Sequence, residues 1–221
     1  MSITSNLLTI KQTLPEDVTL VAVSKTKPIP DLMQAYDAGQ RIFGENKILE
    51  MTDKWETMPK DIQWHMIGHV QTNKVKFMAP YVQLVHGVDS LKLLEEINKQ
   101  AAKNNRVIDC LLQMYIANEE TKFGLDQSEL MQIINHIHTH PDQLQHIRIV
   151  GLMGMATFTK DETQIKKEFT NLKSIFDSLK QQPTTHNLQP SILSMGMSGD
   201  YQLAIQCGST MVRIGSSIFS E

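Results

Sequence analysis

The sequence predicts an α/β fold, a single (β/α)8 barrel of the TIM type spanning residues 1–221. Three observations support this prediction. Short apolar runs rich in β-branched residues recur along the chain, a segment of helical period follows almost every run, and no linker interrupts the pattern. Strict alternation of strand and helix implies a parallel sheet covered by helices. Eight repeats favour closure into a barrel, and 221 residues lie near the lower end of the length of that fold.

The apolar runs predict eight strands. The first is continuously apolar, as expected of a strand buried on both faces, and the stretch from Gln181 to Pro190 is expected to form a loop. In chain order the predicted strands are Leu20–Val23, Arg41–Phe43, Ile62–Met66, Val82–Val85, Val107–Tyr115, Arg148–Leu152, Ile192–Leu193 and Met211–Ile214.

Seven helices are expected between these strands. Ser90 and Asp126 stand where two of them should be capped, and Gly39 stands where another should end. No helix is expected after the eighth strand, so a helix at about residues 3–14 should pack on the barrel near that gap. The seven are Ile29–Ala38, Lys47–Glu56, Thr72–Met78, Leu91–Lys103, Gln127–Thr139, Thr163–Gln181 and Asp200–Ile205.

Composition excludes several classes of function. The net charge is −3 with both signs interspersed, which gives no basis for binding nucleic acid or an acidic membrane. No window approaches the roughly 18 uninterrupted apolar residues of a membrane span, and the N-terminus lacks the features of a secretory signal. We therefore expect a cytoplasmic protein, and we expect it to be a monomer. Cys110 and Cys207 are expected to be separate buried thiols and not a disulfide or metal pair.

Polar and glycine residues follow several predicted strands, at the end of the barrel where active sites lie. Lys25 follows the first strand after Ser24, where partial shielding from water would favour its amine as a nucleophile. Lys27 follows two residues later, so an ordinary surface lysine is the alternative interpretation.

The loops after the last two strands resemble an anion cradle. Gly196 and Gly199 permit close backbone approach, while Gly215 and Ser216 offer N–H groups and a hydroxyl. The alternative is a pair of ordinary tight turns. By strand alternation Arg213 should point inward, where a buried guanidinium needs an acceptor, so a structural salt bridge is its alternative role.

Histidines offer weaker signals. His136, His138 and His140 end a predicted helix, but no nearby cysteine or acidic residue completes a metal site, and positive character there is stabilising by itself. No metal site is therefore expected. His65 and His69 flank a strand end and are better interpreted as polar walls of a pocket.

Five stretches together resemble the pyridoxal 5′-phosphate homeostasis proteins, and the resemblance runs from about Val18 to Phe219. It implies a barrel similar to the N-terminal domain of alanine racemase and of bacterial-type ornithine decarboxylase. The stretches are Ala22–Pro28, Phe43–Asn46, Trp64–Lys74, Leu193–Ser198 and Met211–Ser216.

The resemblance also implies roles for individual residues. Lys25 should carry pyridoxal 5′-phosphate as a Schiff base, and Arg213 should face the pyridine nitrogen. Asn46 and His65 should surround the ring, and the phosphate should be held by Ser194, Gly215 and Ser216. Two positions depart from the family pattern, since Tyr115 stands where asparagine is common and Lys47 where an aromatic residue is frequent.

These roles imply a protein that holds the cofactor without turning over a substrate. Arginine only donates hydrogen bonds, so Arg213 would leave the pyridine nitrogen unprotonated and weaken the cofactor as an electron sink. We also expect no second domain of the kind that racemases have. We expect a reservoir that delivers the cofactor to apoenzymes. The alternatives are a minimal amino-acid racemase or decarboxylase, and a Schiff-base aldolase that uses no cofactor.

Overall fold

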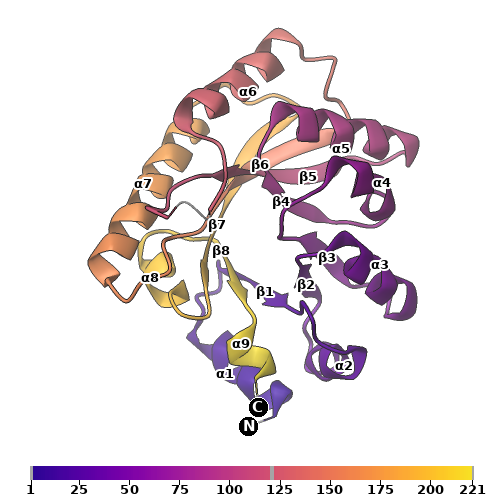
Figure 1. Cartoon of the computed structure of the whole chain (residues 1–221), viewed down its shortest axis with the longest axis vertical. Coiled ribbons are helices and arrows are strands. Elements are labelled where there is room, and N and C mark those ends of the chain that lie inside the picture. The colour runs from indigo at the N-terminus through magenta and orange to yellow at the C-terminus, as the bar shows by residue number, and fades with distance from the viewer. Residues whose placement is uncertain (1, 120–121, 221) are drawn as a thin grey trace.

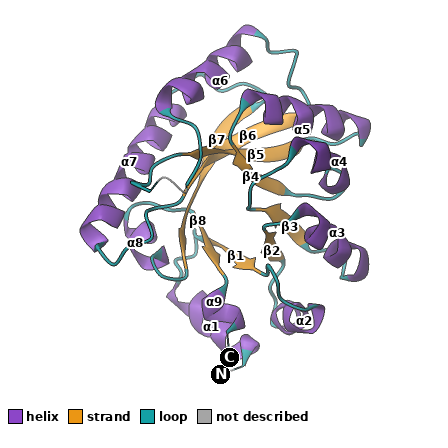
Figure 2. Ribbon diagram, in the orientation of Figure 1, coloured by secondary structure: helices purple, strands orange, loops and turns teal. Residues whose placement is uncertain are grey.

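The computed structural model describes residues 2–119 and 122–220, and it confirms the predicted barrel. Eight parallel strands close in sequence order, β1 pairing with both β2 and β8, and helices surround them (Figures 1 and 2). The strands are β1 Thr19–Val23, β2 Ile42–Glu45, β3 Gln63–Met66, β4 Leu84–Val88, β5 Ile108–Met114, β6 Ile147–Gly154, β7 Leu188–Met197 and β8 Met211–Ile214.

The helices lie close to their predicted positions. Ser90 caps α5 and Asp126 caps α6 with a capping box, as their side chains suggested. The elements are α1 Ile3–Thr13, α2 Ile29–Asp37, α3 Ile48–Thr57, the 3₁₀ turn η1 Thr72–Lys74, α4 Val75–Met78, α5 Leu91–Lys103, α6 Gln127–Thr139, α7 Glu162–Lys180, α8 Tyr201–Gln206 and α9 Ser216–Phe219.

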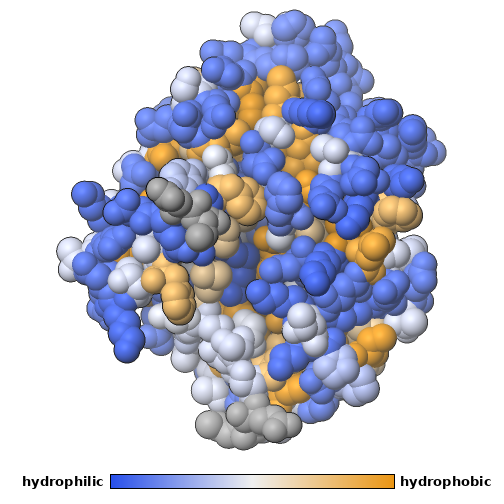
Figure 3. Space-filling model, viewed as in Figure 1, coloured by the Kyte–Doolittle hydropathy of each residue, from blue (hydrophilic) through white to orange (hydrophobic). Residues whose placement is uncertain are grey.

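Strand alternation divides the apolar side chains into two cores. On β1, Val21 points into the barrel, whereas Leu20 and Ala22 pack toward the helices. The inner core is small and consists of Val21, Leu84, Leu111, Val150, Met153 and Met211. Hydrophilic residues cover most of the face in Figure 3, with hydrophobic residues showing between the helices.

The structure corrects the prediction for the seventh strand. β7 begins at Leu188, inside the expected loop, and carries Pro190. Proline has no N–H for the sheet, and the register between β6 and β7 shifts between Ile149 and Gly151, opposite this proline. Because the pairing is irregular at this point, β7 can contain a proline, which a regular inner strand would not tolerate.

The end of the chain differs from the prediction as well. A short helix, α9, follows β8 where no helix was expected. As expected, α1 lies against this end of the chain: the Asn6 side chain donates hydrogen bonds to the carbonyls of Ile218 and Ser220. The predicted helix Thr72–Met78 is divided between η1 and α4.

Two features of the described residues bear on the class of protein. None of their helices is long and apolar enough to cross a membrane. Cys110 and Cys207 are both free, and Cys110 is buried whereas Cys207 is only partly so.

The contact between β6 and β7 gives a test of the fold. A Cβ at Gly151 would lie 1.8 Å from the carbonyl oxygen of Ile192, whereas a Cβ at Gly199 would meet nothing within 4 Å. We expect Gly151→Ala to lower the free energy of unfolding by at least about 2 kcal/mol, and Gly199→Ala to change it by less than about 0.5 kcal/mol. Urea unfolding measures both, and equal losses would contradict the packing described for β6 and β7.

Candidate functional site

A cavity of about 670 Å³ opens at the carboxyl ends of the strands. Five of the seven residues predicted to bind a cofactor line it: Lys25, Asn46, Arg213, Gly215 and Ser216. His65 and Ser194 are buried and are not among the lining residues. The topology therefore brings residues from both ends of the sequence to one wall, at the place where barrels bind their ligands.

Lys25 differs from its lysine neighbours in having no partner. Lys27 donates a hydrogen bond to the Phe219 carbonyl and Lys54 binds two glutamates, but no described residue forms a hydrogen bond or ion pair with the Lys25 amine. Lys25 is exposed, so the expected shielding from water is wrong: Lys25 lies in the turn that follows β1, at the mouth of the cavity that it lines.

Arg213 is a charge held inside the barrel. It is 4% exposed, and burial lowers its pKa to about 10 while nearby Asp200 opposes that effect, so the guanidinium stays charged at neutral pH. It donates hydrogen bonds to the carbonyl and hydroxyl oxygens of Ser194 (3.0 and 2.6 Å) and to the Gly154 carbonyl (3.2 Å). A guanidinium has five N–H groups, and described residues accept three of them, which leaves two for a ligand with a lone pair.

A buried relay begins at this guanidinium. Arg213 donates to the Ser194 hydroxyl oxygen, which lies 3.2 Å from His86 Nδ1. His86 Nε2 lies 3.0 Å from His65 Nδ1. Because a neutral imidazole carries one N–H donor and one acceptor, the tautomers of the two rings are coupled: the direction of one hydrogen bond sets the direction of the other.

Both histidines of the relay are neutral. Burial lowers the pKa of His65 to about 3. Burial also holds the pKa of His86 well below its ordinary value, and the electrostatic influence of the neighbouring His65 and Arg213 adds to that effect. An uncharged imidazole chain costs less to bury beside a guanidinium than a charged one.

The loops after β7 and β8 meet at the cavity. The Gly215 N–H donates a hydrogen bond to the Ser198 hydroxyl (3.2 Å), and a Cβ on Gly215 would lie 3.0 Å from the Val23 carbonyl oxygen, tighter than side chains usually allow. Asp200 closes its loop by accepting the Met197 N–H (2.6 Å). Glycine is thus required where the backbone forms the cavity wall.

Sequence reasoning missed two residues here. His86 lies inside β4, but the predicted strand stopped at Val85 and left it in a loop. Asp200 was expected only to begin a helix; it also lines the cavity, and burial raises its pKa. Leu84 points into the barrel. Had the predicted strand been extended past Val85, the same alternation would have placed His86 inside the barrel as well.

Other predicted features lie elsewhere. The two departures from the family pattern, Lys47 and Tyr115, are not among the described residues that line the cavity, and the Tyr115 hydroxyl donates to the Glu119 carbonyl. His136 and His140 stack with ring centroids 4.7 Å apart. The described part of the chain contains no group of three or more potential metal ligands, although the sequence alone already gave no reason to expect a metal.

Comparison with known proteins agrees with the resemblance drawn from the motifs. The family model "Alanine racemase, N-terminal domain" matches residues 1–221. The pyridoxal phosphate homeostasis protein of Pasteurella multocida is 37% identical over 232 aligned positions, covering 99% of this chain and 97% of the relative. That of Aquifex aeolicus is 35% identical, covering 91% of this chain and 86% of the relative.

Solved structures show the same fold. PipY of Synechococcus elongatus without PLP superposes with a TM-score of 0.90 at 32% identity, covering 99% of this chain and all of that one, and PipY with PLP bound gives 0.87 at 31% identity, with the same coverage. Alanine racemase of Bartonella henselae, at 19% identity, shares the fold with a TM-score of 0.74; the match covers 99% of this chain and 58% of the racemase.

The relay predicts a dependence of stability on pH. His86 has a pKa below the ordinary 6.5, so the unfolded chain binds a proton that the folded protein rejects, and stability falls as pH falls below about 6.5. We expect the free energy of unfolding to fall more steeply in the wild type than in His86→Gln, by about 1.4 kcal/mol per pH unit between about pH 6 and 4.5. Denaturant unfolding at several pH values measures the slopes.

His69→Gln is the matched control, because the His69 side chain is 57% exposed. Its slope should equal that of the wild type. Equal slopes for the wild type and His86→Gln would show that His86 is not held neutral by the relay.

Proposed function

The chain belongs to the pyridoxal phosphate homeostasis proteins, which are built on the alanine racemase N-terminal domain, and from this premise we propose that it binds pyridoxal 5′-phosphate reversibly on Lys25 and supplies it to other proteins. The observation that carries the proposal is a lysine amine that no described residue binds, facing the same cavity as the buried Arg213 and the backbone at Gly215. PipY, which is similar over the whole chain, has been solved with PLP bound.

Lys25 supplies the covalent link. Its deprotonated Nζ attacks the aldehyde carbon of the cofactor, the C=O bond is replaced by C=N, and the oxygen leaves as water with the two amine protons. The same bond yields to another amine or to water, so attachment is reversible. The exposure of Lys25 supports this role, because an incoming amine needs access to the bond.

Arg213 is proposed to face the pyridine nitrogen with one of the two N–H groups that no described residue accepts. A guanidinium donates a hydrogen bond but keeps its proton. The nitrogen then stays unprotonated, and the bound cofactor is a weak electron sink. Asn46, on the same wall, is proposed to contact the ring. His65 is proposed to support the ring from beneath the wall.

The phosphate is proposed to lie between the loops after β7 and β8, against Gly215 and Ser216, which line the cavity beside Ser198 and Gly199. Backbone N–H groups and hydroxyls on two neighbouring loops suit an anion with several acceptor oxygens. Ser194 points toward Arg213 and His86, so we propose that it contributes by orienting Arg213 as well as through the predicted contact with phosphate.

We propose storage and delivery without catalytic turnover. Each titratable group that shares the cavity wall with Lys25 is already engaged: His69 pairs with Asp89, Lys122 with Glu119, and Asp200 accepts the Met197 N–H. Together with Arg213 at the ring nitrogen, this favours a reservoir over the racemase or decarboxylase. The recipients are proposed to be apoenzymes that require the cofactor, met in the cytoplasm by a monomer.

Lys25→Ala should abolish covalent attachment while the fold is kept, because Lys25 makes no described side-chain contact that the fold depends on. Borohydride reduction of the loaded protein followed by peptide mapping measures the attachment site. Lys27→Ala is the matched control and should still be labelled at Lys25. A label on Lys27, or on any other lysine of the wild type, would refute the assignment.

The phosphate should anchor the ligand more than the ring does. A hydrogen bond to a charged acceptor contributes about 1.5–3 kcal/mol, so Ser216→Ala should weaken binding of the phosphate ester by about 10- to 100-fold. Ser217→Ala, which changes a hydroxyl that does not line the cavity, should not. Titration with pyridoxal 5′-phosphate and with pyridoxal measures the affinities. Comparable affinities of the wild type for the two ligands would mean that the two loops do not bind the phosphate.

A further inference from the structure

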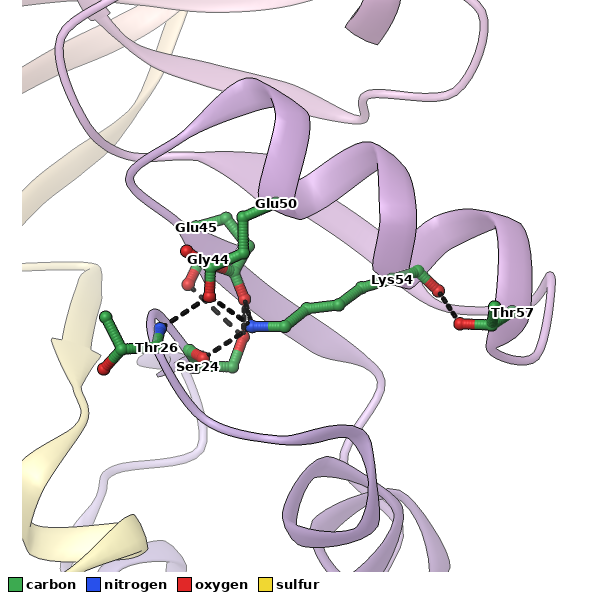
Figure 4. A network of polar contacts seen from close by, with 7 residues as sticks. All are labelled: Ser24, Thr26, Gly44, Glu45, Glu50, Lys54 and Thr57. Atoms are coloured by element: carbon green, nitrogen blue, oxygen red, sulfur yellow. Dashed lines mark hydrogen bonds and ion pairs between the residues drawn. The ribbon is translucent and has the colours of Figure 1, made fainter.

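A polar cluster lies behind Lys25, on the side of β1 that faces α3. It consists of Ser24, Thr26, Glu45, Glu50 and Lys54, and we call it the Lys54 cluster (Figure 4). Its members come from the end of β1, the end of β2 and the helix α3. None of them lines the cavity, and the function proposed above uses none of them.

The Lys54 ammonium is saturated with acceptors. Its three N–H groups meet the Ser24 carbonyl oxygen at 2.9 Å, Glu45 Oε1 at 2.7 Å and Glu50 Oε1 at 2.8 Å. The Ser24 hydroxyl also donates to Glu45 Oε1, at 2.6 Å. Lys54 is 6% exposed and Glu45 is fully buried. The residue before Lys25 is thus fixed through both its backbone and its side chain.

The residue after Lys25 is fixed too. The Thr26 N–H donates to Glu50 Oε1 at 2.6 Å. Thr26 has a φ of +62°, a left-handed conformation that is strongly disfavoured for a β-branched residue. Such a backbone persists only where its surroundings hold it. Here the turn is closed by the Lys27 N–H, which donates to the Ser24 carbonyl oxygen at 3.1 Å, and Glu50 is the side chain that binds the Thr26 N–H itself.

The turn after β1 leaves Lys25 on the cavity side. Ser24 directly follows β1 and lies on the same side as Ala22, which packs toward the helices, so its hydroxyl enters the Lys54 cluster. Lys25 lies in the turn that the Lys27 N–H closes by donating to the Ser24 carbonyl oxygen, and it lines the cavity. Its flanking backbone is held on one side of the barrel wall and its amine is left free on the other.

A contribution to folding stability does not by itself explain the Lys54 cluster. A buried ion pair is often no more stabilising than apolar residues of the same size, and Glu45 Oε2 is buried with no partner among the described residues. Burial raises the pKa of Glu45. Burial also pushes the pKa of Glu50 upward, but its hydrogen bonds from Lys54 and Thr26 outweigh that effect, so the pKa lies below its ordinary value and Glu50 is the firmly charged acid.

We propose that the Lys54 cluster positions Lys25 for its covalent step, with Glu50 as the positioning residue that holds the Thr26 backbone. The proposal rests on the function proposed above and adds to it a requirement on residues outside the cavity. Replacing Glu50 should slow the bond formation at Lys25 without weakening the noncovalent binding of the cofactor's ring and phosphate.

The test separates these two properties. The rate of covalent attachment is followed by visible absorption after mixing with pyridoxal 5′-phosphate. Noncovalent affinity is measured with pyridoxine 5′-phosphate, which has a hydroxymethyl group in place of the aldehyde. We expect Glu50→Ala to slow attachment about 10- to 100-fold, as small misplacements of a reacting group do, and to change the affinity for pyridoxine 5′-phosphate less than about twofold. Glu50→Gln keeps an acceptor oxygen and should restore most of the rate.

Asp177→Ala is the matched control, because Asp177 pairs with Lys173 at the same i,i+4 spacing on the solvent-facing side of α7. It should leave both readouts unchanged. A wild-type rate in Glu50→Ala, or a parallel loss of rate and affinity, would overturn the positioning role and leave the proposed function intact. A wild type that never acquires the absorption would overturn the proposed function and this inference with it.

Discussion

A guanidinium buried at the carboxyl end of β8 organises the polar interior of this barrel. Arg213 needs acceptors, and it finds them on the two preceding strands, at Gly154 and Ser194. Its donation to Ser194 anchors a chain of hydrogen bonds that runs through His86 to His65. One permanent donor is thereby joined to two neutral, buried histidines beneath the cavity.

The turn after β1 is held on one side and left free on the other. The Lys54 cluster binds Ser24 and the Thr26 N–H, and Thr26 has a left-handed conformation. Lys25 stands between them in the chain and lines the cavity. Fixing the backbone while leaving the amine without a partner suits a residue that must form and release a bond repeatedly, because the cost of orienting it is met during folding.

Local periodicity was sufficient to predict the order of the elements, the closure of the barrel and the positions of Lys25 and Arg213, since strand ends and alternation decide these. Local periodicity was insufficient wherever contacts between residues far apart in the sequence determine the structure. The start of β7 was predicted as a loop because it contains Pro190. A proline is tolerated there only because the pairing with β6 is irregular, and the sequence of β7 alone does not show this. His86 was missed because β4 runs past its most apolar residues. Lys54 gave no signal, since its partners come together only when α3 packs over β1 and β2.

Solvent hydrogen exchange at the α-carbon of amino acids tests most directly whether this site stores its cofactor or uses it. The loaded protein is incubated in deuterated water with each common amino acid, then mixed with an apoenzyme that requires the cofactor. The account predicts exchange no faster than with free cofactor, together with recovery of the apoenzyme's activity. A missing acid or base typically costs 10²- to 10⁴-fold in rate, so the distinction is large. Exchange at enzymatic rates that disappears in Lys25→Ala would contradict the account.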